Sequence, residues 1–142
     1  MYKHILIPLD ISPIDEVILQ HVRELARFCK AELILVHVAD GYVARLQDDL
    51  NLEDSQEIKE DRRYLEQKKE ELIKEGFNVT AYLIGGEPAD QILAIAEKEK
   101  CDLIAMSTHG HRFLKDFLLG SVAENIRHRT SIPILMICAK NQ

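Results

Sequence analysis

Residues 107 to 121, STHGHRFLKDFLLGS, could form a site for a negatively charged group. They follow the apolar run CDLIAM and contain Gly110 and, after nine further residues, the pair Gly120–Ser121. Residues 121 to 124 read SVAE, the S-x-x-E pattern of a capping box, which predicts that a helix starts at Gly120–Ser121. A helix start presents unpaired N–H groups and about half a positive charge, and a glycine lets a phosphate reach the backbone. The segment therefore predicts an anion site.

A purely structural interpretation of the two glycines stays open. Gly110 could simply end a strand, and Gly120 could simply permit a turn. The sequence has no G-x-x-x-x-G-K-[ST] loop, and no G-x-G-x-x-G follows the first strand. A Walker-type phosphate loop and a dinucleotide fingerprint are therefore both excluded.

The basic and histidine side chains of the same segment have two interpretations. His109, His111, Arg112 and Lys115 could neutralise phosphates or could be ordinary solvated loop residues. His109 and His111 have no third ligand at suitable spacing, so no metal site is predicted. No serine or cysteine is paired by pattern with a histidine and an acid, so we predict no catalytic residue and at most slow hydrolysis.

Length and composition indicate one globular domain, residues 1–142. The chain has 46% hydrophobic and 30% charged residues, and a net charge of −6 argues against a protein that binds nucleic acid backbones. No apolar run reaches the roughly 18 residues of a membrane helix, and the one in MYKHILIPLD is too short for a signal peptide. We expect a cytoplasmic protein without membrane or nucleic acid partners. Cys29, Cys101 and Cys138 lie in apolar patterns and are expected to be buried free thiols.

Buried strands and amphipathic helices alternate along the first half of the chain. Residues 2–9 and 32–38 are short apolar runs typical of buried strands. Between them a helix is predicted, with Ser12 as N-cap and Pro13 at the first helical position, ending near Lys30. Residues 39–54 are polar and predict a loop.

The second half repeats the alternation. Helices are predicted from Ser55 to Gly76, from Pro88 through Ala96 and from Val122 to Arg129. Strands are predicted at residues 78–84, 103–106 and 132–138. Buried strands alternating with helices predict an α/β domain, a single-domain, doubly wound, five-stranded parallel sheet with helices on both faces.

A ligand is expected at one edge of the predicted sheet. In doubly wound sheets ligands bind at the carboxyl ends of the strands, where the strand order reverses. The relevant loops therefore follow Leu9, Val38, Ile84 and Met106.

Four motifs together resemble the universal stress protein family over essentially the whole chain. They are ILIPLD and LVHVAD at the first two strand ends, GEPADQIL at the third helix, and MSTHG followed nine residues later by GSVAENI. The ATP-binding branch of the family carries G-x-x-G, nine residues, then G-[ST]. Gly110 matches the second glycine and Gly120–Ser121 the closing pair, whereas Ser107 replaces the first glycine.

This resemblance implies a Rossmann-like fold of the adenine nucleotide alpha hydrolase type, with ATP or AMP across the switch point. Asp10 and Val38 would contact the adenine, with Pro8 nearby. The residues Met106, Ser107 and Gly110 would line the ribose and first phosphates, and Gly120, Ser121 and Val122 would hold the outer phosphates. A Mg²⁺ ion would arrive with the nucleotide and keep most of its waters.

Ser107 leaves two outcomes open for the affinity. If the family glycine has a positive φ, serine costs about 1–2 kcal/mol, roughly a tenfold loss. If the glycine only permits close approach, the hydroxyl could contact the ribose.

The function that the resemblance implies is a stress-response or signalling switch that binds an adenine nucleotide. Family members dimerise through the last strand, and IPILMIC would be an exposed edge in a monomer. A homodimer through the C-terminal strand is expected. The alternative is a nucleotide-independent dimeric interaction protein of the same family, which the serine at position 107 favours.

Overall fold

The structure is a computed structural model that describes residues 1–39, 56–109 and 118–139. The loop predicted at residues 39–54 lies outside these ranges except for its first residue. None of the helices in the described ranges has the length and apolar character needed to cross a membrane.

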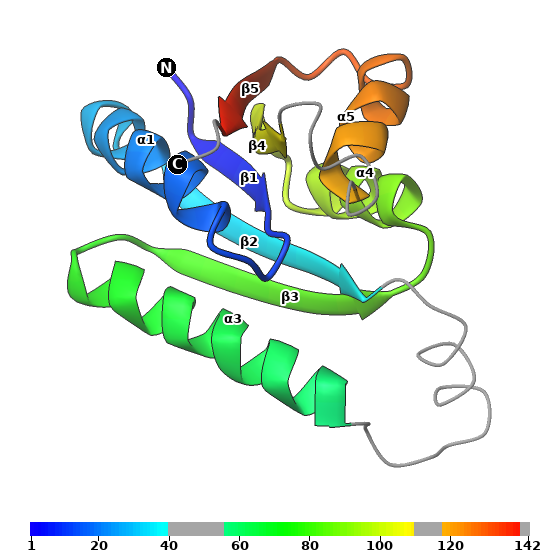
Figure 1. The fold of residues 1–142 in the computed structure, drawn as a ribbon. Helices are drawn as coiled ribbons and strands as arrows, with labels where there is room; N and C mark the ends of the chain where they lie inside the picture. The colour runs from blue at the N-terminus through cyan, green and yellow to red at the C-terminus, as the bar shows by residue number, and fades with distance from the viewer. Residues whose placement is uncertain (40–55, 110–117, 140–142) are drawn as a thin grey trace.

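The predicted strands and helices are all present, in the predicted order (Figure 1). Along the chain they are β1 (His4–Pro8), α1 (Asp15–Cys29), β2 (Glu32–Ala39), α3 (Gln56–Lys74), β3 (Val79–Gly85), α4 (Pro88–Lys98), β4 (Leu103–His109), α5 (Leu118–Arg127) and β5 (Ile134–Ala139). The strands form one parallel sheet in the order β3-β2-β1-β4-β5. The α/β doubly wound fold predicted from the sequence is confirmed.

The strand order reverses direction at β1. From β1 the chain moves outward through β2 to β3, and α4 then carries it back to β4 on the other side of β1. The switch point, where a doubly wound sheet opens a crevice, therefore lies between β1 and β4. These two strands are joined through only two register pairs, Ile5 with Leu103 and Leu6 with Ile104.

Alternate side chains of the buried strands fill two separate cores, one on each face of the sheet. Ile5 and Ile7 pack with α1 and α3 on one face, whereas Leu6 and Met106 pack with α4 and α5 on the other. Figure 1 shows the sheet between these two pairs of helices. Burial of both faces explains why the strands are continuously apolar in sequence.

The predicted start of α1 is wrong. The helix begins at Asp15, and its N-cap residue Ile14 makes no side-chain capping bond. Ser12, the predicted cap, instead donates its hydroxyl to Asp10 Oδ2 at 3.3 Å. The physical reason is that the first amides of the helix, those of Asp15, Glu16 and Val17, already donate to the carbonyl oxygens of residues 12 to 14, so the serine hydroxyl has no helix donor to cap.

The predicted start of α5 is also wrong. A capping box placed it at Gly120–Ser121, but the helix begins at Leu118. Leucine is a good helix former, and Leu118 and Leu119 extend the helix toward the N-terminus. Ser121 therefore lies within the first turn and does not cap the helix.

The three cysteines differ in burial, contrary to expectation. Cys101 is buried, and desolvation raises the pKa of its thiol to about 12. Cys29 is half-buried and Cys138 is exposed. Cys138 is exposed because β5 is an edge strand of the sheet.

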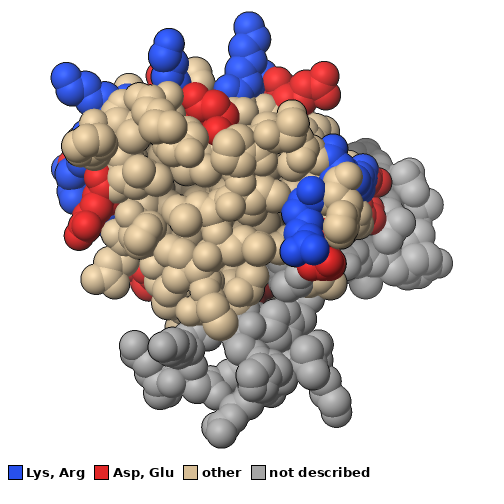
Figure 2. Space-filling view, turned by 90° about the horizontal axis from the view of Figure 1, so that it is seen from above, with Lys and Arg blue, Asp and Glu red and all other residues tan. Residues whose placement is uncertain are grey.

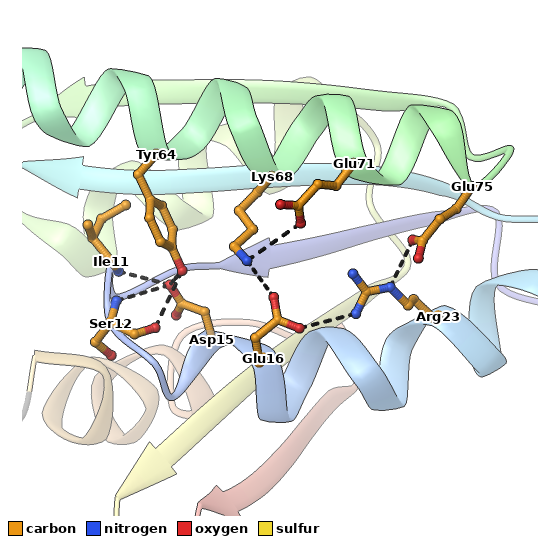
Figure 3. Close-up of polar contacts among 9 residues, drawn as sticks. All are labelled: Ile11, Ser12, Asp15, Glu16, Arg23, Tyr64, Lys68, Glu71 and Glu75. Atoms are coloured by element: carbon orange, nitrogen blue, oxygen red, sulfur yellow. Dashed lines mark hydrogen bonds and ion pairs between the residues drawn. The ribbon is translucent and has the colours of Figure 1, made fainter.

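Charged side chains connect α1 to α3, the two helices that cover the same face of the sheet (Figure 3). Glu16 of α1 accepts a hydrogen bond from Lys68 Nζ at 2.6 Å and lies 3.4 Å from Arg23 Nη1. Arg23 also donates from Nε to Glu75 of α3 at 2.8 Å. The hydrogen bond from Lys68 lowers the pKa of the Glu16 carboxyl despite partial desolvation. Glu16 is thus the central anion of a network between the two helices.

We expect Glu16→Gln to reduce the free energy of unfolding by up to about 1 kcal/mol at neutral pH and low salt, since the pairs are partly exposed. Folding lowers the pKa of Glu16 below its ordinary value of 4.5, so its stabilisation is complete above that pH. The difference between variant and wild type should vanish as the pH falls through the folded-state pKa, and should shrink in molar salt. Urea denaturation across this pH range measures it. Glu24→Gln, an exposed position on the same helix, is the control; an equal effect there would refute the network.

Candidate functional site

A hollow opens at the carboxyl edge of the sheet, beside the switch point. It encloses about 290 Å³, part of it open to solvent. The strand ends of β1 and β2, the start of α4 and the first half of α5 form its walls, through Pro8, Leu9, Asp10, Val36, His37, Val38, Pro88, Ile92 and Val122.

Four of the nine residues predicted from the sequence line this hollow. They are Pro8, Asp10, Val38 and Val122. Pro8 and Asp10 come from the end of β1, and Val38 comes from the adjacent strand β2. Val122 reaches the same space from α5, more than 80 positions later in the chain. The parallel sheet brings these distant residues together because its strands end at one edge.

Met106 and Ser107 do not line the hollow. Met106 is fully buried in the core beneath it, with Val38 and Val122. Ser107 is 1% exposed, and its hydroxyl donates to the carbonyl oxygen of Ile14 at 3.4 Å. Alternation along β4 turns this side chain toward α1, on the other face of the sheet.

Ser107 has an unstrained backbone. Ser107 lies within β4, paired with Ile137 of β5. The described non-glycine residues with positive φ are Ile11, Lys30 and Lys100. The backbone of Ser107 is therefore not strained, and its hydroxyl does not lie at the hollow. Neither of the two effects predicted for this serine is present.

Two of the remaining predicted residues, Gly120 and Ser121, lie in α5, as does Val122. Gly110 lies outside the described residues, as do His111, Arg112 and Lys115. Gly120 is the third residue of α5, a position whose amide has no carbonyl partner in a preceding helical turn, and Ser121 is the fourth. Val122 is the fifth residue, so its amide falls within the regular helical pattern.

The electrostatics of the hollow favour a neutral ligand with a donor group. Among the residues that the structure describes, the lining contains the Asp10 carboxylate and neither lysine nor arginine. Val36, Val38 and Ile92 supply apolar walls. A flat apolar ring with an amino group would match these walls, whereas a phosphate would meet the negative charge of Asp10.

The start of α4 cannot serve as a second anion site. Glu87 is its N-cap, and its carboxylate accepts from the amides of Ala89 at 3.2 Å and Asp90 at 2.8 Å. The predicted helix start at Pro88 is confirmed. Glu87 therefore satisfies these two amides of α4 with its own negative charge.

His37 is a hydrogen-bonded core histidine, as predicted. Its Nδ1 lies 2.8 Å from the carbonyl oxygen of Leu9, so Nδ1 carries the proton and donates. The residue is 8% exposed, and its other nitrogen lies 3.6 Å from Asp61 Oδ2 of α3. Desolvation raises the pKa of the Asp61 carboxyl.

A buried carboxylate fixes the loop that joins β1 to α1. Asp15 is 0% exposed, and it accepts from the amides of Asp10, Ile11 and Ser12 at 2.8, 3.0 and 3.3 Å. Tyr64 of α3 donates its hydroxyl to Asp15 Oδ2 at 2.8 Å (Figure 3). Burial raises the pKa of the Asp15 carboxyl, and these hydrogen bonds oppose the rise.

Sequence reasoning missed five residues of the lining. They are Leu9, Val36, His37, Pro88 and Ile92. Pro88 carried a signal, because GEPADQIL was one of the motifs of the family resemblance. Ile92 lies in the same motif, but its helical spacing is also that of an ordinary core residue, so the spacing did not distinguish it.

No group of three or more metal-ligating side chains occurs within the described ranges.

The chain matches the model of the universal stress protein family over residues 1–137. It is 35% identical to Universal stress protein MJ0577 of Methanocaldococcus jannaschii, over 99% of this chain and 98% of that protein. The solved structure of MJ0577 superposes with a TM-score of 0.81 and 36% identity, covering 100% of this chain and 99% of that one.

Two structures with bound nucleotides share the fold at lower identity. A universal stress protein from Archaeoglobus fulgidus in complex with dAMP has a TM-score of 0.70 and 24% identity, covering 96% of this chain and 98% of that one. A universal stress protein in complex with cAMP has a TM-score of 0.68 and 18% identity, and 96% of each chain is covered. By sequence and fold over nearly its whole length, this chain belongs to the universal stress protein family.

Proposed function

We propose that this protein binds an adenine nucleotide, ATP or AMP, and acts as a stress-response or signalling switch. The observation that carries the proposal is the hollow at the switch point, lined by Pro8, Asp10, Val38 and Val122. The resemblance to the family implies the same four residues as ligand contacts. Two relatives with the same fold are complexes with dAMP and with cAMP, which supports an adenine nucleotide as the ligand class.

The adenine would lie in the hollow. The adenine amino group is a donor, and the Asp10 carboxylate is an acceptor at the end of β1. The apolar walls from Val38 and Ile92 would cover the faces of the ring. Guanine presents a carbonyl oxygen at the equivalent position and would be repelled by the carboxylate.

The ribose and phosphates would extend from the hollow toward the start of α5. There Gly120 would present its helix amide to the phosphate oxygens, with Ser121 and Val122 beside it, and Gly110, which lies outside the described residues, is expected to contact the first phosphates. Any Mg²⁺ would be bound through the phosphates and its own waters. The ligand would therefore join residues from both ends of the chain.

The protein would also form a homodimer through β5. This strand is an edge of the sheet, with Met136 46% exposed and Cys138 exposed. Figure 2 looks onto the molecule from the side on which β5 lies and shows a broad surface without charged side chains. Pairing with a second copy would cover this edge. The same feature favours the second candidate function, a dimeric interaction protein that needs no nucleotide.

Gly120→Asp should abolish or strongly weaken nucleotide binding. Its carboxylate would stand beside the phosphates, and repulsion should raise the Kd for AMP by at least about tenfold. An acidic residue in the first turn suits a helix, so the fold should remain. Gly120→Ala, without the charge, is the control. Calorimetric titration measures both, and the absence of both heat and a thermal shift for the wild type at millimolar AMP and ATP would refute nucleotide binding and leave the second candidate.

Asp10 should determine the choice of base. We expect AMP to bind at least about tenfold more tightly than GMP, and Asp10→Asn to narrow that ratio because the amide can also donate to guanine. Competition titrations with the two nucleotides measure the ratio. Equal affinities in the wild type would contradict this role of Asp10.

Met136→Lys should convert the dimer to a monomer, because a lysine on an edge strand opposes strand pairing. Light scattering should report twice the chain mass of 16.3 kDa for the wild type and one chain mass for the variant. Thr80→Lys, exposed on the opposite edge strand β3, is the control and should stay dimeric. A monomeric wild type at micromolar concentration would refute the dimer.

A further inference from the structure

The loop beside the hollow contains a strained residue. Ile11 has φ 58°, in the left-handed region that β-branched residues avoid. Glycine would adopt this conformation without strain, but the chain has isoleucine here. Such a conformation persists only when surrounding contacts enforce it. Because Asp10 lines the hollow and precedes Ile11 directly, those contacts also set the position of Asp10.

The enforcing contacts converge on the Asp15 carboxylate. Oδ1 accepts from the amide of Asp10, and Oδ2 accepts from the amides of Ile11 and Ser12. Every donor in this arrangement points at the carboxylate, which suits its ionised form. A buried anion with several donors loses much of its stabilisation when one donor is removed.

One of those donors comes from another element, α3. The Tyr64 hydroxyl donates to Asp15 Oδ2 at 2.8 Å and lies 3.4 Å from the Ser12 carbonyl oxygen. Desolvation and the neighbouring Asp15 carboxylate raise the pKa of Tyr64, so the hydroxyl stays protonated and able to donate. Figure 3 shows this side chain reaching from α3 to the start of α1.

A second connection links α3 to the beginning of the same loop. Asp61, one turn before Tyr64, faces Nε2 of His37, and Nδ1 of His37 donates to the Leu9 carbonyl. The two connections from α3 therefore contact both ends of the segment from Leu9 to Ser12. Leu9 and Asp10 of that segment both line the hollow.

We propose that Tyr64, acting through Asp15, is a positioning residue that holds the strained loop Asp10–Ser12 in the conformation that forms the hollow. This makes the position of α3 a determinant of the site. The effect on ligand affinity rests on the nucleotide binding proposed above, whereas the effect on the loop does not.

Tyr64→Phe tests the proposal by hydrogen exchange without ligand. The amides of Asp10, Ile11 and Ser12 should exchange about tenfold faster, relative to core amides of β1, because one bond to a buried charge is lost. In the same variant the Kd for AMP should rise by about tenfold. Normalising to β1 separates local opening of the loop from a general loss of stability.

Tyr82→Phe is the matched control. Tyr82 of β3 also donates its hydroxyl to a carboxylate, that of Glu99, and it does not line the hollow. This variant should leave both the loop exchange and the AMP affinity unchanged. Equal effects of the two substitutions, or no acceleration of loop exchange in Tyr64→Phe, would overturn the proposal.

Ile11→Gly provides a rescue that a merely structural tyrosine would not show. Glycine adopts φ 58° without strain, so the loop should depend less on Asp15 and Tyr64. In the Ile11→Gly background the additional effect of Tyr64→Phe on loop exchange and on the Kd for AMP should fall to about twofold. An undiminished effect would overturn the proposal.

Failure of the proposed function has a different signature. If wild-type protein does not bind AMP, nucleotide binding is refuted, but the exchange rates still support or overturn the positioning role. If AMP binds and Tyr64→Phe changes neither exchange nor Kd, the positioning role alone is refuted.

Discussion

The buried carboxylate of Asp15 is the interaction on which the arrangement of the site depends. A fully buried anion is tolerated only when donors surround it, and here the donors are the amides of the loop from Asp10 to Ser12. The need to satisfy one charge thus forces three consecutive amides to converge. The strained φ of Ile11 follows from that convergence, and Asp10 is placed at the hollow as a result.

The sheet topology determines which strand ends and helices lie beside this loop. Because β1 is central, the loop after it lies next to the ends of β2 and β4, with α4 and α5 on one face and α1 and α3 on the other. The hollow lies on the α4 and α5 face, whereas Asp15 and Tyr64 lie on the α1 and α3 face. The loop at the end of β1 is therefore the element through which contacts on one face of the sheet affect the other.

Much of the fold could be predicted because buried parallel strands have a simple pattern. The family resemblance implied Asp10 and Val38 as site residues, and the strand pattern agreed on their location, because both lie where an apolar strand ends and parallel strands end at one edge. The role of Asp15 could not be predicted, since an acidic residue in a first helical turn looks the same whether it faces solvent or an adjoining loop. The start of α5 was misplaced because SVAE fits a capping box locally, and only the tertiary fold shows that Leu118 is already helical. The positive φ of Ile11 could not be predicted from the sequence, because that conformation is expected at glycine.

The short ladder between β1 and β4 has a mechanical consequence. Residues before this seam form β1, β2 and β3 with α1 and α3, and residues after it contribute β4, β5 and α5. The register pairs across it are Ile5–Leu103 and Leu6–Ile104, with the Asp102 amide bonding to the His4 carbonyl at their amino-terminal end. The hollow spans the seam, with Asp10 on one side and Val122 on the other. A molecule bound there would contact residues on both sides of the seam, so binding would oppose the separation of β1 from β4.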